Sequence, residues 1–139
     1  MPDPLGITGS IIATLQLTAS IMEYLKAVHD AQKDRINFLS EVSMLHRLLA
    51  ALQIRVEKAN GSNDPWFIQV RELGIERGPL DRLKSHLKHL ESKLKPAKGL
   101  KAVGRTLAWK FDKADIESII SSIERTKMLV SLALTDDLS

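Results

Sequence analysis

The sequence predicts an all-α protein, a helical bundle of four to five helices in a single domain over residues 1–139. Three segments carry apolar residues at alternating spacings of three and four, which places those residues on one face of a helix. No segment alternates apolar and polar residues in the manner of a half-buried strand. Residues that favour turns separate the periodic segments, and helices joined in this way form a bundle rather than one long coiled coil.

The length and the composition exclude several classes of protein. A chain of 139 residues is long enough to hold a core without covalent staples. It contains no Cys, which excludes disulfide scaffolds, thiolate zinc sites and cysteine nucleophiles. The net charge is only +3, and two Trp, one Tyr and three Phe leave little for base stacking. Nucleic acid is therefore not expected as a partner.

The first helix is expected over residues 5–30, and most of it carries no charge. Every residue between Asp3 and Glu23 is uncharged, and at about 1.5 Å per residue such a helix is long enough to cross a bilayer. A secretory signal begins with basic residues, so the acidic Asp3 argues against one. The polar residues of the segment argue against a constitutive membrane span; they are Thr8, Ser10, Thr14, Gln16, Thr18 and Ser20.

Two interpretations of this uncharged segment are open. A helix without charge on any side is usually the central helix of a bundle, and the same helix can enter a membrane in a second state. For that state we expect a membrane-active element over residues 4–22, with Leu5, Ile7, Ile11, Ile12 and Leu15 as its lipid-facing contacts. The small residues Gly9 and Ala13 stand four apart, a spacing that lets membrane helices approach closely.

The second helix is expected over residues 34–59. Asp34 is a plausible N-cap, and Asn60-Gly61 provides the stop. The loop through Pro65 consists of residues that favour turns. The apolar seam of this helix comprises Phe38, Val42, Leu45, Leu49, Leu52, Val56 and Ala59.

Two further long helices follow a short apolar segment. Residues 66–73 are expected to form a short helix or an ordered apolar plug that ends at Gly74. A helix over 79–95 has Pro79 in its first turn, where proline is tolerated. The last helix is expected over 112–135 with Asp112 as its cap. The core residues expected along the seams include Leu45, Leu49, Leu52, Leu87, Leu90, Ile120 and Ile123.

The sequence contains little that resembles catalytic chemistry. His86 and His89 stand three apart, so they could share a helical face, but no third ligand of matching spacing is nearby. The chain has no phosphate-binding loop, dinucleotide fingerprint, nucleophile elbow or zinc-protease motif. We therefore expect no enzyme activity, no metal, no cofactor and no small-molecule substrate.

A basic run follows the third long helix. No acidic residue occurs between Glu91 and Asp112. One interpretation is a solvated basic linker. The other is a patch for anionic lipid headgroups, which contributes up to about 1 kcal/mol for each basic residue near a charged membrane. The basic residues of this candidate patch are Lys93, Lys95, Lys98, Lys101, Arg105 and Lys110.

Both ends of the chain are similar to those of a known family. The start, Met-Pro-Asp-Pro-Leu-Gly-Ile-Thr-Gly-Ser-Ile-Ile-Ala13, resembles the start of fungal HeLo-like domains, the N-terminal domains of fungal NLR/STAND receptors. The run Leu107-Ala-Trp109-Lys-Phe111 through Glu117 is similar to the Trp-Pro-Phe element that precedes the last helix of the family. Lys110 replaces the usual proline there. The match continues from Ile123 through Leu134.

The resemblance implies a cell-death effector domain of the fungal innate-immunity and heterokaryon-incompatibility type. These domains resemble the HeLo domain of the HET-S prion system and the four-helix bundle of the necroptosis executor MLKL. The implied protein is cytoplasmic at rest, then self-associates and permeabilises the plasma membrane through its N-terminal helix, with anionic lipids as its partner. Trp109 and Phe111 are expected to pack into the bundle as structural anchors. The alternative is a non-enzymatic oligomerisation or adaptor module of an NLR-type receptor.

Overall fold

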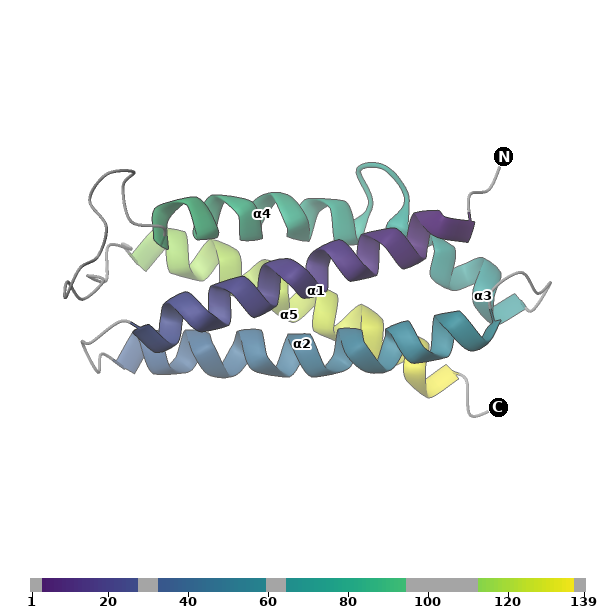
Figure 1. The fold of residues 1–139 in the computed structure, drawn as a ribbon, viewed down its shortest axis with the longest axis horizontal. Helices are drawn as coiled ribbons and strands as arrows, with labels where there is room; N and C mark the ends of the chain where they lie inside the picture. The colour runs from purple at the N-terminus through teal and green to yellow at the C-terminus, as the bar shows by residue number, and fades with distance from the viewer. Residues whose placement is uncertain (1–3, 28–32, 60–64, 95–112, 137–139) are drawn as a thin grey trace.

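The computed structural model describes residues 4–27, 33–59, 65–94 and 113–136, and it confirms the all-α fold (Figure 1). The four long helices are α1 (Pro4–Ala27), α2 (Lys33–Ala59), α4 (Pro79–Leu94) and α5 (Lys113–Asp136). A short helix α3 (Pro65–Val70) continues into the 3-10 helix η1 (Arg71–Gly74). These ranges agree closely with those expected from the sequence.

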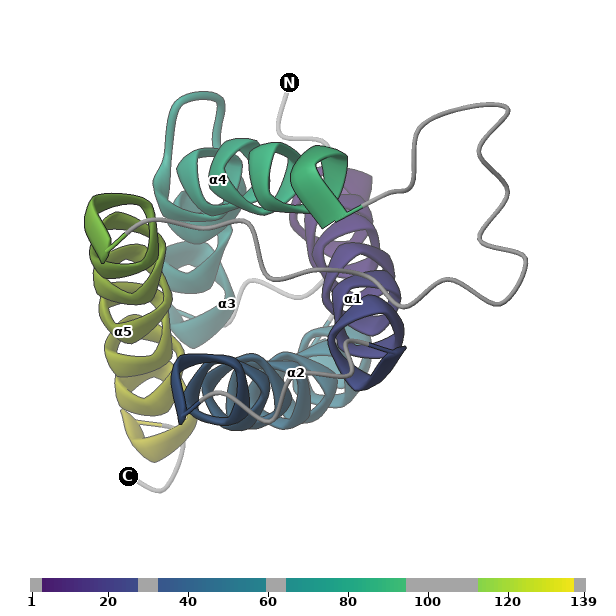
Figure 2. The ribbon, with the colours of Figure 1, turned by 90° about the vertical axis from the view of Figure 1, so that its left-hand side faces the viewer.

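The long helices form a four-helix bundle in which each contacts two neighbours. α1 packs against α2 and α4, and α5 packs against the same two helices. The end-on view in Figure 2 shows α1 and α5 at opposite corners. α4 and α5 are antiparallel, because Lys93 at the end of α4 meets Asp115 at the start of α5, and His86 meets Ser122.

The core follows the three-and-four spacing of α2 and α4. Leu45, Leu49 and Leu52 on α2, like Leu87 and Leu90 on α4, are fully buried. The prediction of these core residues is confirmed. It is wrong for one position of α5, since Ile120 is only partly buried.

The buried stripe of α5 differs from the expected one at Ile120, while Ile123 lies in the core as predicted. Ile119 lies in the core in place of Ile120, and Thr126 continues the stripe between Ile123 and Val130. The observed spacing from Ile116 is three, four, three and four, which keeps successive residues on one helical face. Ile119 and Ile120 are adjacent isoleucines, so side-chain type does not distinguish them, and the packing of α5 against α2 and α4 decides which one is buried.

The short segment α3 closes one end of the bundle (Figure 1). Trp66, Phe67 and Val70 are buried, which confirms the expected apolar plug. The Trp66 indole Nε1 donates a hydrogen bond of 2.6 Å to the carbonyl of Ala133 on α5. The Arg55 guanidinium lies 4.7 Å from the centre of the Trp66 ring, within the range of a cation–π interaction.

The 3-10 helix brings its backbone directly against α1. A Cβ atom added at Gly74 would lie 2.9 Å from the Cα atom of Ile7. Real Cβ atoms do not approach backbone this closely, so the side chain is excluded by packing rather than by backbone conformation. The glycine that the sequence marks as a stop thus also permits the contact between η1 and α1.

We predict that Leu49→Ala lowers the free energy of unfolding by about 2–5 kcal/mol, because it leaves a cavity in the core. Ile54→Ala on the same helix is the control, since Ile54 is 58% exposed. Its effect should be about 0.5 kcal/mol or less. Urea denaturation followed by circular dichroism measures both, and equal losses would contradict the assigned buried face of α2.

We also predict opposite effects for two glycine substitutions. Gly74→Ala should destabilise the bundle by about 1–3 kcal/mol, because its methyl group must displace the α1 backbone. Gly9→Ala should stabilise it by about 0.5–1 kcal/mol, since Gly9 lies in a helix with nothing within 4 Å of an added Cβ. Thermal unfolding measures the two shifts. A stabilising Gly74→Ala would show that η1 does not press against α1.

Candidate functional site

The residues predicted to face lipid do not share one face of α1. Ile7 and Ile11 are buried in the core, whereas Ile12 is 37% exposed. Leu15 and Ala13 are partly buried and Gly9 is exposed. The side chain of Leu5 lies outside the described residues. In this bundle, then, Ile7 and Ile11 serve as core residues, and their role in a membrane stays a prediction.

The middle of the buried face of α1 is polar. Thr14 and Thr18 are buried between Ile11 and Ile21, and Ser10 is buried between Ile7 and Ile11. The Thr14 hydroxyl donates a 2.8 Å hydrogen bond to the Ser10 carbonyl, and the Thr18 hydroxyl donates one of 2.9 Å to the Leu15 carbonyl. Both acceptors are carbonyls of α1, so these two hydrogen bonds do not depend on the contacts of α1 with other helices.

One of these hydroxyls also reaches a neighbouring helix. The Thr18 oxygen lies 2.7 Å from Nδ1 of His46 on α2. The Thr18 hydroxyl donates its proton to the Leu15 carbonyl. In the contact with His46, the Thr18 oxygen is therefore the acceptor and the His46 Nδ1–H group is the donor. His46 is partly buried, which agrees with the position beside the seam that the sequence indicates.

No described helix is both long enough and apolar enough to span a membrane. α1 is long enough but not sufficiently apolar, because Ser, Thr and Gln residues interrupt its aliphatic side chains. Ile12 on the outer surface and the partly buried Leu17 and Met22 nevertheless leave α1 with apolar side chains on several sides.

Most of the candidate lipid patch lies outside the described residues. This holds for Lys95, Lys98, Lys101, Arg105 and Lys110, and also for the predicted anchors Trp109 and Phe111. Lys93 is described at the end of α4. Its ammonium lies 2.6 Å from a carboxylate oxygen of Asp115, and both side chains are about one-third exposed. Lys93 therefore forms an ion pair that joins α4 to α5.

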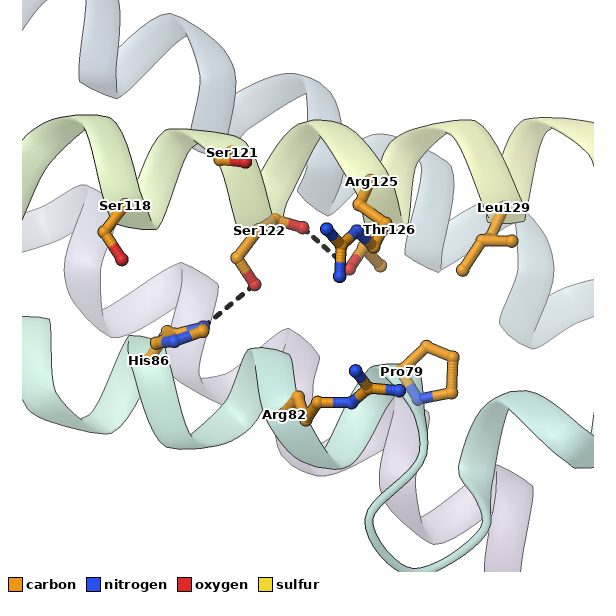
Figure 3. Close-up of a pocket in the computed structure, with 9 residues that line it drawn as sticks. All are labelled: Pro79, Arg82, His86, Ser118, Ser121, Ser122, Arg125, Thr126 and Leu129. Atoms are coloured by element: carbon orange, nitrogen blue, oxygen red, sulfur yellow. Dashed lines mark hydrogen bonds between the residues drawn. The ribbon is translucent and has the colours of Figure 1, made fainter.

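A polar groove between α4 and α5 encloses a cavity of about 350 Å³ (Figure 3). In Figure 3 His86 and Ser122 face each other across it, Arg82 and Arg125 follow along the two helices, and Pro79 and Leu129 lie at the far end. His86 Nδ1 lies 3.0 Å from the Ser122 hydroxyl. The Thr126 hydroxyl is buried and donates to the Ser122 carbonyl at 3.0 Å.

The histidines do not form a metal site in the described part of the chain. His86 is partly buried against Ser122, whereas His89 is exposed. Nor do the described residues contain a group of three or more metal-ligating side chains. Among the described residues that line the groove there is no carboxylate to orient His86 against Ser122. A serine nucleophile requires such an oriented base.

Sequence reasoning missed this groove. The available signal was the stripe of small and basic residues on α5, where Ser118, Ser122 and Arg125 recur at spacings of four and three. On α4, Arg82 and His86 also stand four apart. Each stripe by itself is typical of a solvated helical face, and only the pairing of the two helices brings them together.

No family model, curated protein or solved structure matches this chain.

We predict different effects for two substitutions that remove buried hydroxyls of α1. Thr18→Val should cost about 1–2 kcal/mol of folding free energy, because it leaves His46 Nδ1 without its partner. Thr14→Val should be neutral or stabilising, since the Thr14 hydroxyl bonds only to a carbonyl of its own helix. Denaturant unfolding of the two variants tests this difference. Equal costs would mean that the Thr18–His46 bond contributes nothing specific.

Proposed function

We propose that this domain is a non-enzymatic cell-death effector that oligomerises on activation and permeabilises the plasma membrane through α1. It rests in the cytoplasm as the bundle described above, and its membrane partner carries anionic lipids. The resemblance of its two ends to fungal HeLo-like domains supports this function. The observation that carries the proposal is the character of α1, which is free of charge from Pro4 to Met22 yet buries hydroxyl groups in its middle.

The buried hydroxyls of α1 contribute less to its attachment than aliphatic side chains at the same positions would, and only the Thr18 hydroxyl offsets this with a contact to His46 on α2. A fully buried aliphatic side chain contributes roughly 1.5–3 kcal/mol, and Thr14 and Thr18 occupy positions where such side chains would otherwise lie. The Thr8 hydroxyl oxygen is buried as well and has no hydrogen-bond partner among the described residues. Such an orphaned group opposes burial. These groups therefore make the burial of α1 less favourable than that of a fully aliphatic helix.

The same hydroxyls are tolerated in lipid. A bilayer requires that polar groups find partners inside the helix or in a neighbouring helix. Thr14 and Thr18 each donate to a carbonyl of α1 itself. These bonds remain when the helix leaves the bundle. The helix therefore loses the contact of Thr18 with His46 but carries its other hydroxyl bonds with it.

Self-association provides hydrogen-bond partners for polar side chains that a single α1 would expose to lipid. No described helix is apolar enough to span a membrane alone, and Ser and Thr side chains stabilise contacts between membrane helices. Gly9 is exposed with open space around it, so the bundle leaves free the small residue that close helix contact requires. Several copies of α1 together would satisfy polar groups that one copy leaves exposed to lipid.

The second candidate function is an oligomerisation or adaptor module of an NLR-type receptor. The burial of Ile7 and Ile11 favours it, because these side chains already have apolar partners in the bundle. In that case α1 stays in the core and the outer surface of the bundle recruits other chains.

We predict that Gly9→Asp reduces the release of dye from anionic liposomes by at least about tenfold. An Asp near the bilayer centre costs roughly 2.5–3.5 kcal/mol of insertion free energy, and each 1.4 kcal/mol is about tenfold. The folded bundle should tolerate the change, because Gly9 is exposed and an added Cβ meets nothing within 4 Å. Circular dichroism checks that the variant is folded.

Two control variants separate insertion from other effects. Gly9→Ala keeps a small apolar residue and should permeabilise within about fivefold of the parent domain, because it only stabilises the resting bundle by about 0.5–1 kcal/mol. Asn37→Asp adds the same charge at an exposed position of α2, so it reports any general repulsion from anionic lipid. A folded Gly9→Asp variant that releases dye as well as the parent would contradict insertion of α1. A parent domain that releases no dye in the oligomeric state would favour the adaptor function.

A further inference from the structure

The groove between α4 and α5 concentrates positive charge in a concave site. Arg82 approaches it from α4 and Arg125 from α5 (Figure 3). The acidic residues of these helices nearest in sequence, Asp81 and Glu124, are not among the residues that line it. Two guanidinium groups in a cleft whose described lining contains no carboxylate raise the local concentration of anions.

No carboxylate of the described residues pairs with either arginine. Among the described residues, Arg82 and Arg125 form no ion pair. Other basic side chains of the same two helices are paired, since Lys84 lies 3.9 Å from Asp81 and Lys127 lies 2.6 Å from Glu41. The guanidinium groups of the groove thus keep their donors available for a ligand.

The rest of the groove supplies neutral hydrogen-bonding groups. The Ser122 hydroxyl and the His86 imidazole are held together at 3.0 Å, so their positions are fixed relative to each other. Ser118 lines the same side of the cavity, one helical turn before Ser122. Hydroxyl and imidazole groups beside two arginines are the donors that bind the several oxygens of a phosphate group.

We propose that this groove binds a phosphate monoester, with Arg82 and Arg125 on its charged oxygens and Ser122 and His86 on a further oxygen. A monoester carries nearly two negative charges and three acceptor oxygens, and it matches two guanidinium groups better than a carboxylate does. The volume of about 350 Å³ suits a small phosphorylated group. This binding does not depend on membrane permeabilisation by α1.

The phosphate can belong to a soluble metabolite or to a lipid headgroup. Glycerol 3-phosphate and phosphatidic acid carry the same phosphate monoester, so they serve as the two probes. The 139-residue chain is titrated with glycerol 3-phosphate and followed by two-dimensional NMR. Its binding is then compared between vesicles of neutral lipid that contain phosphatidic acid and vesicles of equal surface charge that contain phosphatidylserine.

The decisive variant is Arg82→Gln with Arg125→Gln. Its matched control is Arg47→Gln with Lys58→Gln, which removes the same charge from exposed positions of α2. We expect glycerol 3-phosphate to shift the amide signals of Ser118 and Ser122 in a saturable way. The groove variant should bind it at least about tenfold more weakly, as expected for loss of charge-assisted bonds. The control variant should bind it within about twofold of the parent chain.

The two probes assign the source of the phosphate. Saturable binding of glycerol 3-phosphate without preference for phosphatidic acid vesicles assigns a soluble ligand. A preference for phosphatidic acid over phosphatidylserine that only the groove variant loses assigns a lipid headgroup. Equal losses in the groove variant and its control would overturn the proposal, because they would reflect the total charge of the protein. Absence of both glycerol 3-phosphate binding and phosphatidic acid preference would overturn it as well.

Discussion

Burial of the uncharged helix α1 between α2 and α4 is the constraint on which this bundle depends. A helix with apolar side chains on several sides cannot satisfy them against a single neighbour. Here α2 and α4 cover two sides, and η1 covers the beginning of the helix at Ile7. The close contact of η1 with α1 at Gly74 contributes to this burial. The other long helices each present one apolar stripe to the shared core, and their charged residues occupy the remaining surface.

Polar contacts are distributed unequally around the bundle. Ion pairs join α5 to both of its neighbours, through Lys127 with Glu41 on α2 and through Lys93 with Asp115 on α4, each at 2.6 Å. The ion pair of Glu23 with Lys26 in α1 lies within that helix. Two hydrogen bonds join α1 to α2, between Thr18 and His46 and from the Arg35 guanidinium to the Leu25 carbonyl at 3.1 Å. Apart from these contacts, α1 is held to the described bundle by apolar burial, which is non-directional. This difference gives the proposed release of α1 a physical basis.

Small side chains explain why a groove lies between α4 and α5. The core-facing stripe of α5 consists of Ile116, Ile119 and Ile123, but the side toward α4 carries Ser118 and Ser122. Serine fills much less volume than leucine or isoleucine, so the two helices leave a cavity that aliphatic residues would have closed. The hydroxyls that create the space also make it polar.

The sequence by itself determined the helices, their approximate ends and the buried faces of α2 and α4, because these depend on spacings within a few residues. Local spacing could not set the buried face of α1, since a helix with apolar residues on several sides has no single preferred orientation. Only the tertiary structure placed Ser10, Thr14 and Thr18 inward and chose Ile119 over Ile120. It alone also brought Arg82 on α4 opposite Arg125 on α5. Such a meeting depends on which helices become neighbours and in which direction they run, and that is decided by burial across the whole chain rather than by any one segment.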